Sequence, residues 1–283
     1  MSEVVEHRLI VAGSEVVWDE WSGGDELVVL LHGSGADAST WQGIAAKLAP
    51  ARTVVALDRR GYGRSAHAPI GDHRIHRDDA LAVIDSVTQR LNPSAVHLIG
   101  WSSGGVIALD MVAQRPSLAT TVSVLEAPVH GVSGMTPGMV GLLAKVNLLT
   151  AVGRRKDAAA AFYRWAGGTT DGSNLFDEAD DELRTMLLSY SDVIIRELRP
   201  SKVGSLGEHV DLSAVEASRV PVTWLLGARS IPFYRSRAEH ARQTVPTIEI
   251  VEIAGATHVM HREKEADVLA VIETAMVRRR ASA

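Results

Sequence analysis

The sequence predicts an α/β protein built on a mostly parallel sheet of about eight strands flanked by helices. Two observations predict this fold class. Short runs that are continuously apolar recur along the chain, as expected of strands buried on both faces. Helical patterns separate these runs, and strands that alternate with helices build parallel sheets covered on both sides.

The expected elements follow from these runs in chain order. The first two strands, residues 4–11 and 16–21, form an antiparallel hairpin around Ala12-Gly13-Ser14. The six further strands are expected at 27–31, 53–57, 96–99, 121–125, 222–226 and 248–253. The helices between and after them are expected at 40–48, 78–91, 104–114, 235–243 and 263–277.

The alternation breaks between residues 128 and 215, which carry helical patterns and no convincing strand. We interpret this stretch as a helical cap inserted over the carboxyl edge of the sheet, within one domain of residues 1–283. Its apolar side chains are candidates for binding a hydrophobic substrate, although each can equally belong to the core. The candidates are Met135, Met139, Leu143, Phe162, Trp165 and Tyr190, and Trp41 and Trp101 can add aromatic surface near Ser102.

Composition excludes several classes of function. The 283 residues include 29 basic and 34 acidic ones, a net charge of −5 that favours neither nucleic acid nor an anionic membrane. No cysteine is present, which excludes disulfides, zinc–thiolate sites and a cysteine nucleophile. No apolar run approaches the ~18 residues of a membrane span, and the amino terminus does not resemble a secretory signal. We expect a cytoplasmic protein without metal or cofactor; monomer and homodimer stay open.

The sharpest motif is Gly100-Trp101-Ser102-Ser103-Gly104, which stands between a buried strand and a helical pattern. In this context Gly-x-Ser-x-Gly is typical of the nucleophile elbow, a strained turn that holds the serine side chain out from the sheet edge. Cβ atoms at residues 100 and 104 would crowd such a turn. The sequence therefore predicts Ser102 as a nucleophile, and the alternative is a purely structural turn.

A second loop predicts an oxyanion hole. Leu31-His32-Gly33-Ser34-Gly35 follows the third strand, and the two expected donors are the backbone N–H groups of Ser34 and Ser103. Because these donors are backbone groups, the two serine side chains are not expected to matter chemically. We interpret His32 as a loop histidine bonded to neighbouring backbone.

Among eleven histidines, His258 is the best placed to activate the serine. It lies in a glycine-containing loop between the last strand and the last helix. His261 is interpreted as the start of that helix. His73 and His76 stand at helical spacing without a third ligand nearby, so we expect both at the surface and no metal site.

These segments together resemble the α/β-hydrolase family. The resemblance rests on His-Gly-Ser-Gly at 32–35, on Leu-Asp-Arg-Arg-Gly-Tyr-Gly-Arg-Ser at 57–65, on the elbow and on Gly-Ala-Thr-His at 255–258. It covers the chain from about residue 27 to its end, apart from the insert. It implies the sheet of that family and the chain order serine, acid, histidine for the catalytic residues.

The acid departs from the commonest pattern of the family. Most members place an aspartate after the strand before the histidine, but here that strand runs into Ser230. Glu126 ends the previous strand, where some members carry their acid, and its additional methylene helps it reach His258. We predict the triad Ser102–His258–Glu126. The alternative is that Glu126 anchors the cap and the enzyme has lost its catalytic acid.

Such a triad with an oxyanion hole performs acyl transfer. The sequence predicts a hydrolase of carboxylesterase or lactonase type that cleaves a small hydrophobic ester, thioester or lactone through an acyl-enzyme on Ser102. The two-serine elbow with a glutamate after the next strand is also similar to the fungal zearalenone lactonases, which adds macrolactone hydrolysis to this class. Cofactor-free perhydrolase or haloperoxidase chemistry, a ligand-binding receptor and an inactive scaffold stay open.

Overall fold

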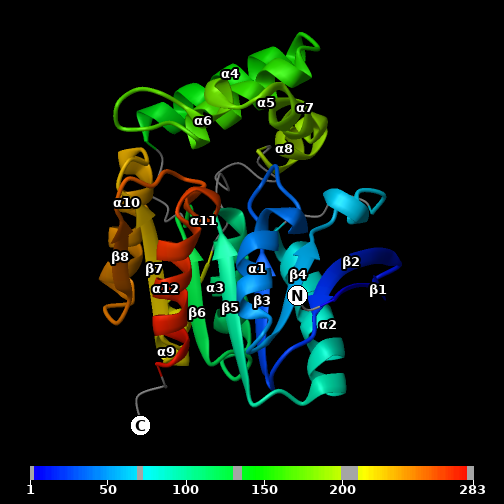
Figure 1. Ribbon diagram of the computed structural model, residues 1–283. Coiled ribbons are helices and arrows are strands. Elements are labelled where there is room, and N and C mark those ends of the chain that lie inside the picture. Colours follow the sequence, from blue (N-terminus) through cyan, green and yellow to red (C-terminus); the bar gives the residue numbers. More distant parts are fainter. Residues whose placement is uncertain (1–2, 69–72, 130–135, 199–209, 279–283) are drawn as a thin grey trace.

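The computed structural model describes residues 3–68, 73–129, 136–198 and 210–278. Eight strands form one sheet in the order β1-β2-β4-β3-β5-β6-β7-β8 (Figure 1). β2 pairs antiparallel with β1 and β4, and the other neighbours are parallel. The predicted fold class is therefore confirmed. The strands are β1 Val4–Val11, β2 Ser14–Trp21, β3 Glu26–Leu31, β4 Thr53–Asp58, β5 Ala95–Trp101, β6 Thr121–Leu125, β7 Val222–Gly227 and β8 Glu249–Ile253.

Helices cover both faces of the sheet, because successive side chains of a strand point to opposite sides. In β3, Leu27, Val29 and Leu31 enter one apolar core, while Val28 and Leu30 enter the other. The first core packs against α2 His73–Leu91, α3 Ser103–Gln114, α9 Leu212–Ser218 and α10 Pro232–Thr244. The second packs against α1 Gln42–Leu48 and α12 Glu265–Met276.

Several element boundaries differ from those expected. β2 starts at Ser14, so only Ala12 and Gly13, both with positive φ, form the hairpin turn. α2 starts at His73 instead of residue 78. The last helix is interrupted at Lys264 into α11 Met260–Glu263 and α12. The first helix is preceded by a 3₁₀ turn, η1 Ala38–Trp41, and a second 3₁₀ turn is η2 Gly63–Ser65.

Five helices lie above the carboxyl ends of the parallel strands, and we call them the cap helices (Figure 1). Side chains cap three of their amino ends: Thr136 accepts from Met139 N–H, Asn174 from Asp177 and Asp180 from Leu183. The cap helices are α4 Pro137–Ala151, α5 Arg155–Ala166, α6 Leu175–Glu178, α7 Asp181–Ser189 and α8 Ser191–Glu197.

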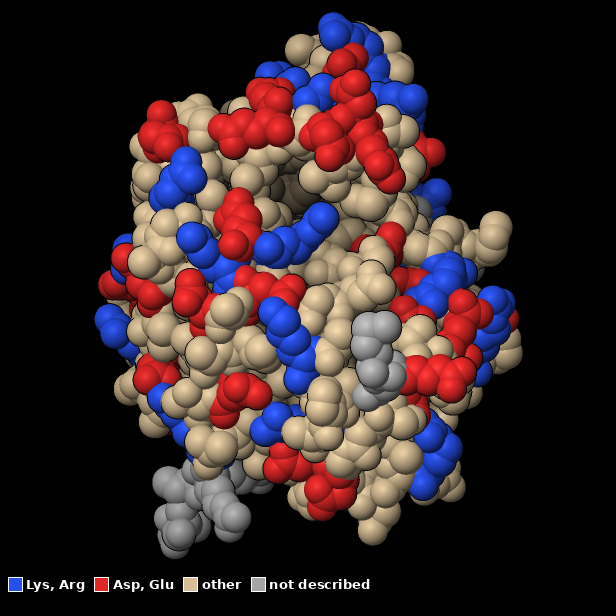
Figure 2. All heavy atoms as spheres, in the orientation of Figure 1, with Lys and Arg blue, Asp and Glu red and all other residues tan. Residues whose placement is uncertain are grey.

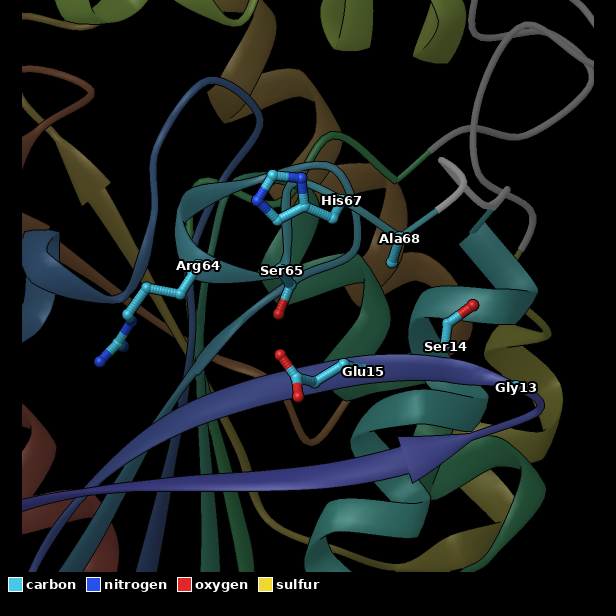
Figure 3. Close-up of a pocket in the computed structure, with 7 residues that line it drawn as sticks. All are labelled: Gly13, Ser14, Glu15, Arg64, Ser65, His67 and Ala68. Carbon is cyan, nitrogen blue, oxygen red and sulfur yellow. The ribbon is translucent and has the colours of Figure 1, made fainter.

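The surface is hollowed between the cap helices and the sheet (Figure 2). A separate crevice of about 150 Å³ lies beside the β1–β2 turn, where Glu15 and Ser65 face each other (Figure 3). None of the predicted catalytic residues lines this crevice. Across the described ranges, each helix is too short or too polar to cross a membrane.

Candidate active site

Ser102 occupies the single-residue connection between β5 and α3. Its backbone has φ 53° and ψ −123°, a conformation that costs energy for a residue with a side chain. Its N–H donates to the Leu125 carbonyl at 2.8 Å, which ties the turn to the end of β6. A Cβ on Gly104 would lie 2.2 Å from the Leu31 carbonyl oxygen, so the turn requires glycine there.

Glu126 follows β6 directly and is completely buried. Its φ of 50° is also in the left-handed region, and its N–H donates to the Leu225 carbonyl of β7 at 3.1 Å. Oε1 accepts the Gly227 N–H at 2.7 Å, and Oε2 is 2.7 Å from Nδ1 of His258. Both oxygens are therefore engaged by the sheet edge and the histidine, and neither of these bonds leads to the cap helices.

His258 lies in the loop between β8 and α11 and is 5% exposed. Its carbonyl accepts the Trp101 indole N–H at 2.7 Å, which ties the loop to the end of β5. A carboxylate has no hydrogen to donate, so the hydrogen of this bond belongs to Nδ1, and the corresponding neutral tautomer leaves Nε2 as an acceptor.

Tyr234, on α10, was not identified from the sequence as part of the site. Its ring stacks on the imidazole of His258, with centroids 4.2 Å apart and planes at 11°. Its hydroxyl donates to the Ala166 carbonyl at the end of α5, a bond of 2.9 Å. Tyr234 therefore connects the histidine to a cap helix. No local sequence signal could have revealed it, because the contact joins segments far apart in the chain.

Ser102 is brought to the same sheet edge as His258, but their side chains form no hydrogen bond to each other within the described ranges. In ligand-free sites such bonds are often long and shorten only when substrate binds. Ser102 is instead close to the loop after β3, since a Cβ added to Gly33 would lie 3.0 Å from the Ser102 Cβ. The structure thus gathers the nucleophile candidate and the expected oxyanion loop.

The two residues expected to supply the oxyanion donors, Ser34 and Ser103, contact each other through their side chains. The hydroxyls of Ser34 and Ser103 are 3.0 Å apart and hydrogen-bonded to each other, a contact that the sequence did not suggest. His32 orders the same loop as expected, because its Nδ1–H donates to the Gly33 carbonyl at 2.7 Å and its Nε2 accepts the Arg59 N–H at 3.0 Å.

Two buried histidines support this region in the neutral form. Burial, reinforced by the charge of Arg59, lowers the pKa of His32 to about 3. Burial, reinforced by the neighbouring His258, lowers the pKa of His261 to about 3. His261 begins the last helical region as expected, and its Nε2 is 2.8 Å from the Thr40 hydroxyl. Both rings are therefore uncharged at neutral pH.

The expectation that His73 and His76 lie at the surface is wrong. His76 is 3% exposed, with Nε2 3.7 Å from the carboxylate of Glu197 on α8. His73 is partly buried, with Nε2 3.0 Å from Asp110 Oδ2. The helical spacing was correct, but α2 begins early enough to turn both rings inward toward carboxylates. Among the residues described, no cluster of three metal-binding side chains is present.

The predicted substrate-binding residues have varied surroundings. Trp41 and Trp101 pack in the core beneath the site, both near the ring of His261. Tyr190 connects α7 and α8 to the loops below, because its hydroxyl donates to Asp37 Oδ2 at 2.9 Å and accepts the Gly63 N–H at 3.1 Å.

The other candidates that the structure describes belong to the cap helices. The ring of Trp165 packs at a tilt of 60° against that of Phe233, with centroids 4.9 Å apart, and Phe162 packs between helices. Met139 is 8% exposed, and Leu143 is only partly buried. Met135 lies outside the described residues. Their contact with substrate stays a prediction.

The position where most α/β-hydrolases carry their acid is occupied by Ser230. Its hydroxyl is buried and has no hydrogen-bond partner in the described part of the chain. A Cβ added to Gly227 would lie 2.7 Å from the Ser230 Oγ and 2.8 Å from the Thr257 carbonyl. Ser230 therefore lies beside both the Gly227 amide that binds Glu126 and the loop that carries His258.

Comparison with known proteins identifies the family of the chain. A model of the alpha/beta hydrolase family matches residues 28–271. The hydrolase YraK of Bacillus subtilis is 37% identical over 97 residues, which cover 33% of this chain and 34% of that protein. The pimeloyl-[acyl-carrier protein] methyl ester esterase of Klebsiella pneumoniae is 33% identical over 127 residues, which cover 44% of this chain and 46% of that protein. The matches thus span less than half the length of these curated relatives.

Solved structures share the fold. MGS-M2, an alpha/beta hydrolase enzyme from a deep-sea metagenome of the Medee basin, superposes with a TM-score of 0.76 at 12% identity, covering 98% of this chain and 99% of that one. Est816, described as degrading N-acyl homoserine lactones, gives a TM-score of 0.75 at 16% identity. The superposition covers 95% of this chain and 99% of Est816.

The neutral buried histidines predict a loss of stability in mild acid. The unfolded chain protonates His32 and His261 near pH 6.5, whereas the folded chain holds the pKa of each near 3. Between these values the unfolded state binds more protons, so stability is complete above pH 6.5 and falls toward pH 3. Each histidine contributes a slope of about 1.4 kcal/mol per pH unit at most.

Urea unfolding between pH 7 and pH 4 measures this slope. We expect His261→Gln, which can keep the bond to Thr40, to reduce the slope by about one proton equivalent. The same exchange at the exposed His67 is the control. An unchanged slope in His261→Gln would show that His261 accepts a proton in the folded state.

Proposed function

Because the chain belongs to the alpha/beta hydrolase family, we propose that it is a serine hydrolase that cleaves a carboxylic ester or lactone of a hydrophobic small molecule. The observation that carries this proposal is the 2.7 Å bond between His258 and a fully buried Glu126, next to a strained serine turn. Strained backbone and a satisfied buried carboxylate at one sheet edge are the arrangement that nucleophilic catalysis needs.

The proposed reaction begins with Ser102. Its Oγ attacks the carbonyl carbon while Nε2 of His258 takes the hydroxyl proton, and Glu126 stabilises the imidazolium that forms. The backbone N–H groups of Ser34 and Ser103 hold the negative oxygen of the tetrahedral intermediate. His258 then gives its proton to the leaving oxygen, and water releases the acyl group from Ser102 by the same steps.

Ester chemistry is supported by the Klebsiella relative, whose name describes a methyl ester esterase. A hydrophobic substrate is supported by the cap helices, which add partly buried apolar side chains such as Leu143 and Trp165 above the sheet edge. We propose that residues 128–215 form a cap over the substrate. The hollow in Figure 2 lies between these helices and the sheet.

Replacement of the nucleophile tests the reaction class. We expect a fluorophosphonate probe to label the protein once and abolish hydrolysis of p-nitrophenyl butyrate, since both need an activated serine hydroxyl. Ser102→Ala should lose labelling and activity together, while Ser189→Ala, at an exposed serine of α7, should lose neither. Mass spectrometry locates the label. Full hydrolysis by Ser102→Ala would overturn the proposal.

Removal of the acid tests the assignment of Glu126. We expect Glu126→Ala to lower kcat by roughly 10³ or more, because the imidazole loses the group that fixes its tautomer and balances its charge. Adding Ser230→Asp should restore part of the rate, since Ser230 borders Gly227 and Thr257. Thermal unfolding separates a catalytic loss from a folding defect. An unchanged kcat in Glu126→Ala would rule out its role as the acid.

A further inference from the structure

A buried group of charged and polar side chains joins the cap to the loops of the site. We call it the Arg59 cluster, formed by Arg59, Tyr62, His76 and Glu197. Arg59 and Tyr62 follow β4, His76 is on α2, and Glu197 is the last residue of α8. One Glu197 oxygen lies 3.7 Å from both Arg59 Nη1 and His76 Nε2. Arg59 is 3% exposed, and its guanidinium lies 4.9 Å from the centre of the Tyr62 ring.

The Arg59 cluster contributes no regular hydrogen bonds of its own. The side-chain nitrogens of Arg59 and His76 and the carboxylate oxygens of Glu197 are buried, without partners at hydrogen-bonding geometry in the described ranges. A buried ion pair that lacks such bonds adds little net stability, because desolvation of its charges offsets their attraction. The ion pair is therefore expected to act mainly through the position of the groups that surround it.

The charge state of the cluster is defined. Burial raises the pKa of Glu197, but the charge of Arg59, followed by His76 and Ser34, outweighs burial and holds the pKa at about 2. Burial, reinforced by Arg59 and opposed by Glu197, lowers the pKa of His76. At neutral pH the cluster thus holds one positive guanidinium, one carboxylate and a neutral imidazole.

The carboxylate of Glu197 also lies close to Ser34. Ser34 is near enough to Glu197 to lower its pKa, and a carboxylate only accepts hydrogen bonds. The Ser34 and Ser103 hydroxyls are hydrogen-bonded to each other across 3.0 Å, so Ser34 stands between the charge of Glu197 and Ser103. A polar path leads from the cap, through Ser34, to the residue that follows the nucleophile.

We propose that Glu197, Ser34 and Ser103 are positioning residues that hold the two halves of the oxyanion hole in register when α8 is seated on the sheet. The inference rests on the proposed function. Ser34 supplies one backbone donor from the loop after β3, and Ser103 supplies the other from the first residue of α3. Their hydroxyl bridge fixes the spacing of these two segments directly, and Glu197 lies beside Ser34 at the end of α8.

The test measures the bridge with p-nitrophenyl butyrate as substrate. We expect Ser34→Ala and Ser103→Ala each to lower kcat by about 10-fold, less than the ~10²–10³ cost of losing a donor, with KM changed less than about twofold. The double variant should be no slower than the slower single variant, because one bridge is lost in each case. Glu197→Gln should lower kcat similarly and keep KM.

A transition-state analogue separates positioning from a general structural role. A trifluoromethyl ketone with the butyryl chain adds the Ser102 oxygen to its carbonyl carbon and forms an oxyanion. Its inhibition constant should rise in proportion to the fall in kcat/KM across the series. Asp192→Asn, at an exposed residue of α8, is the matched control and should change neither quantity.

Three results would contradict a role of the Ser34–Ser103 bridge in catalysis. Wild-type kcat in both Ser34→Ala and Ser103→Ala would overturn the proposal, as would a loss that appears only in KM or additive losses in the double variant. Ser103→Ala removes a single oxygen, so it keeps the test valid even where Glu197→Gln does not fold. If Ser102→Ala hydrolyses the substrate at the wild-type rate, the proposed function fails, and that result is distinct from a failure of the bridge.

Discussion

The hydrogen bond between His258 and Glu126 is the interaction on which the arrangement of the site depends. It joins the end of β6 to the loop after β8, with β7 between them, and the same carboxylate binds the amide of Gly227 at the end of β7. Three neighbouring strand ends are thereby fixed by one side chain. A buried carboxylate tolerates this position because both of its oxygens are hydrogen-bonded.

Much of this site could be predicted from the sequence, because its main parts are local. The glycines around Ser102 show the turn, the apolar strand before Glu126 delivers it to the carboxyl edge, and the loop after the last strand carries His258. Parallel strands end at the same edge of a sheet, so separate motifs could be brought together without knowledge of the contacts. Helix starts were less predictable: α2 extends five residues earlier than its apolar pattern, and α11 breaks from α12 at Lys264.

The contacts with the cap could not be predicted, because they join distant segments through single side chains. Tyr234 bonds Ala166, Tyr190 bonds Asp37, and Glu197 pairs with Arg59. The first contact involves the tyrosine that stacks on His258, the second reaches the loop that follows the proposed oxyanion residues, and the third forms part of the Arg59 cluster. His76 illustrates the same limit, since its spacing predicted a helix face but not the carboxylate that the helix meets. The cap is thus connected to the site by polar contacts as well as by apolar packing.

The Glu197 carboxylate lies near the proposed oxyanion hole, and its negative charge would oppose the charge that such a hole stabilises. Arg59 offsets this charge, because Nη1 of its guanidinium lies 3.7 Å from the carboxylate of Glu197. The two opposite charges together form a dipole, whose field falls off faster with distance than the field of a single charge. The balance requires both partners: α8 carries the negative one, and the loop after β4 carries the positive one. Separation of α8 from the sheet would leave Arg59 without this carboxylate partner. Contact between α8 and the loop after β4 therefore keeps the two charges together, which limits the negative field that reaches the proposed oxyanion hole.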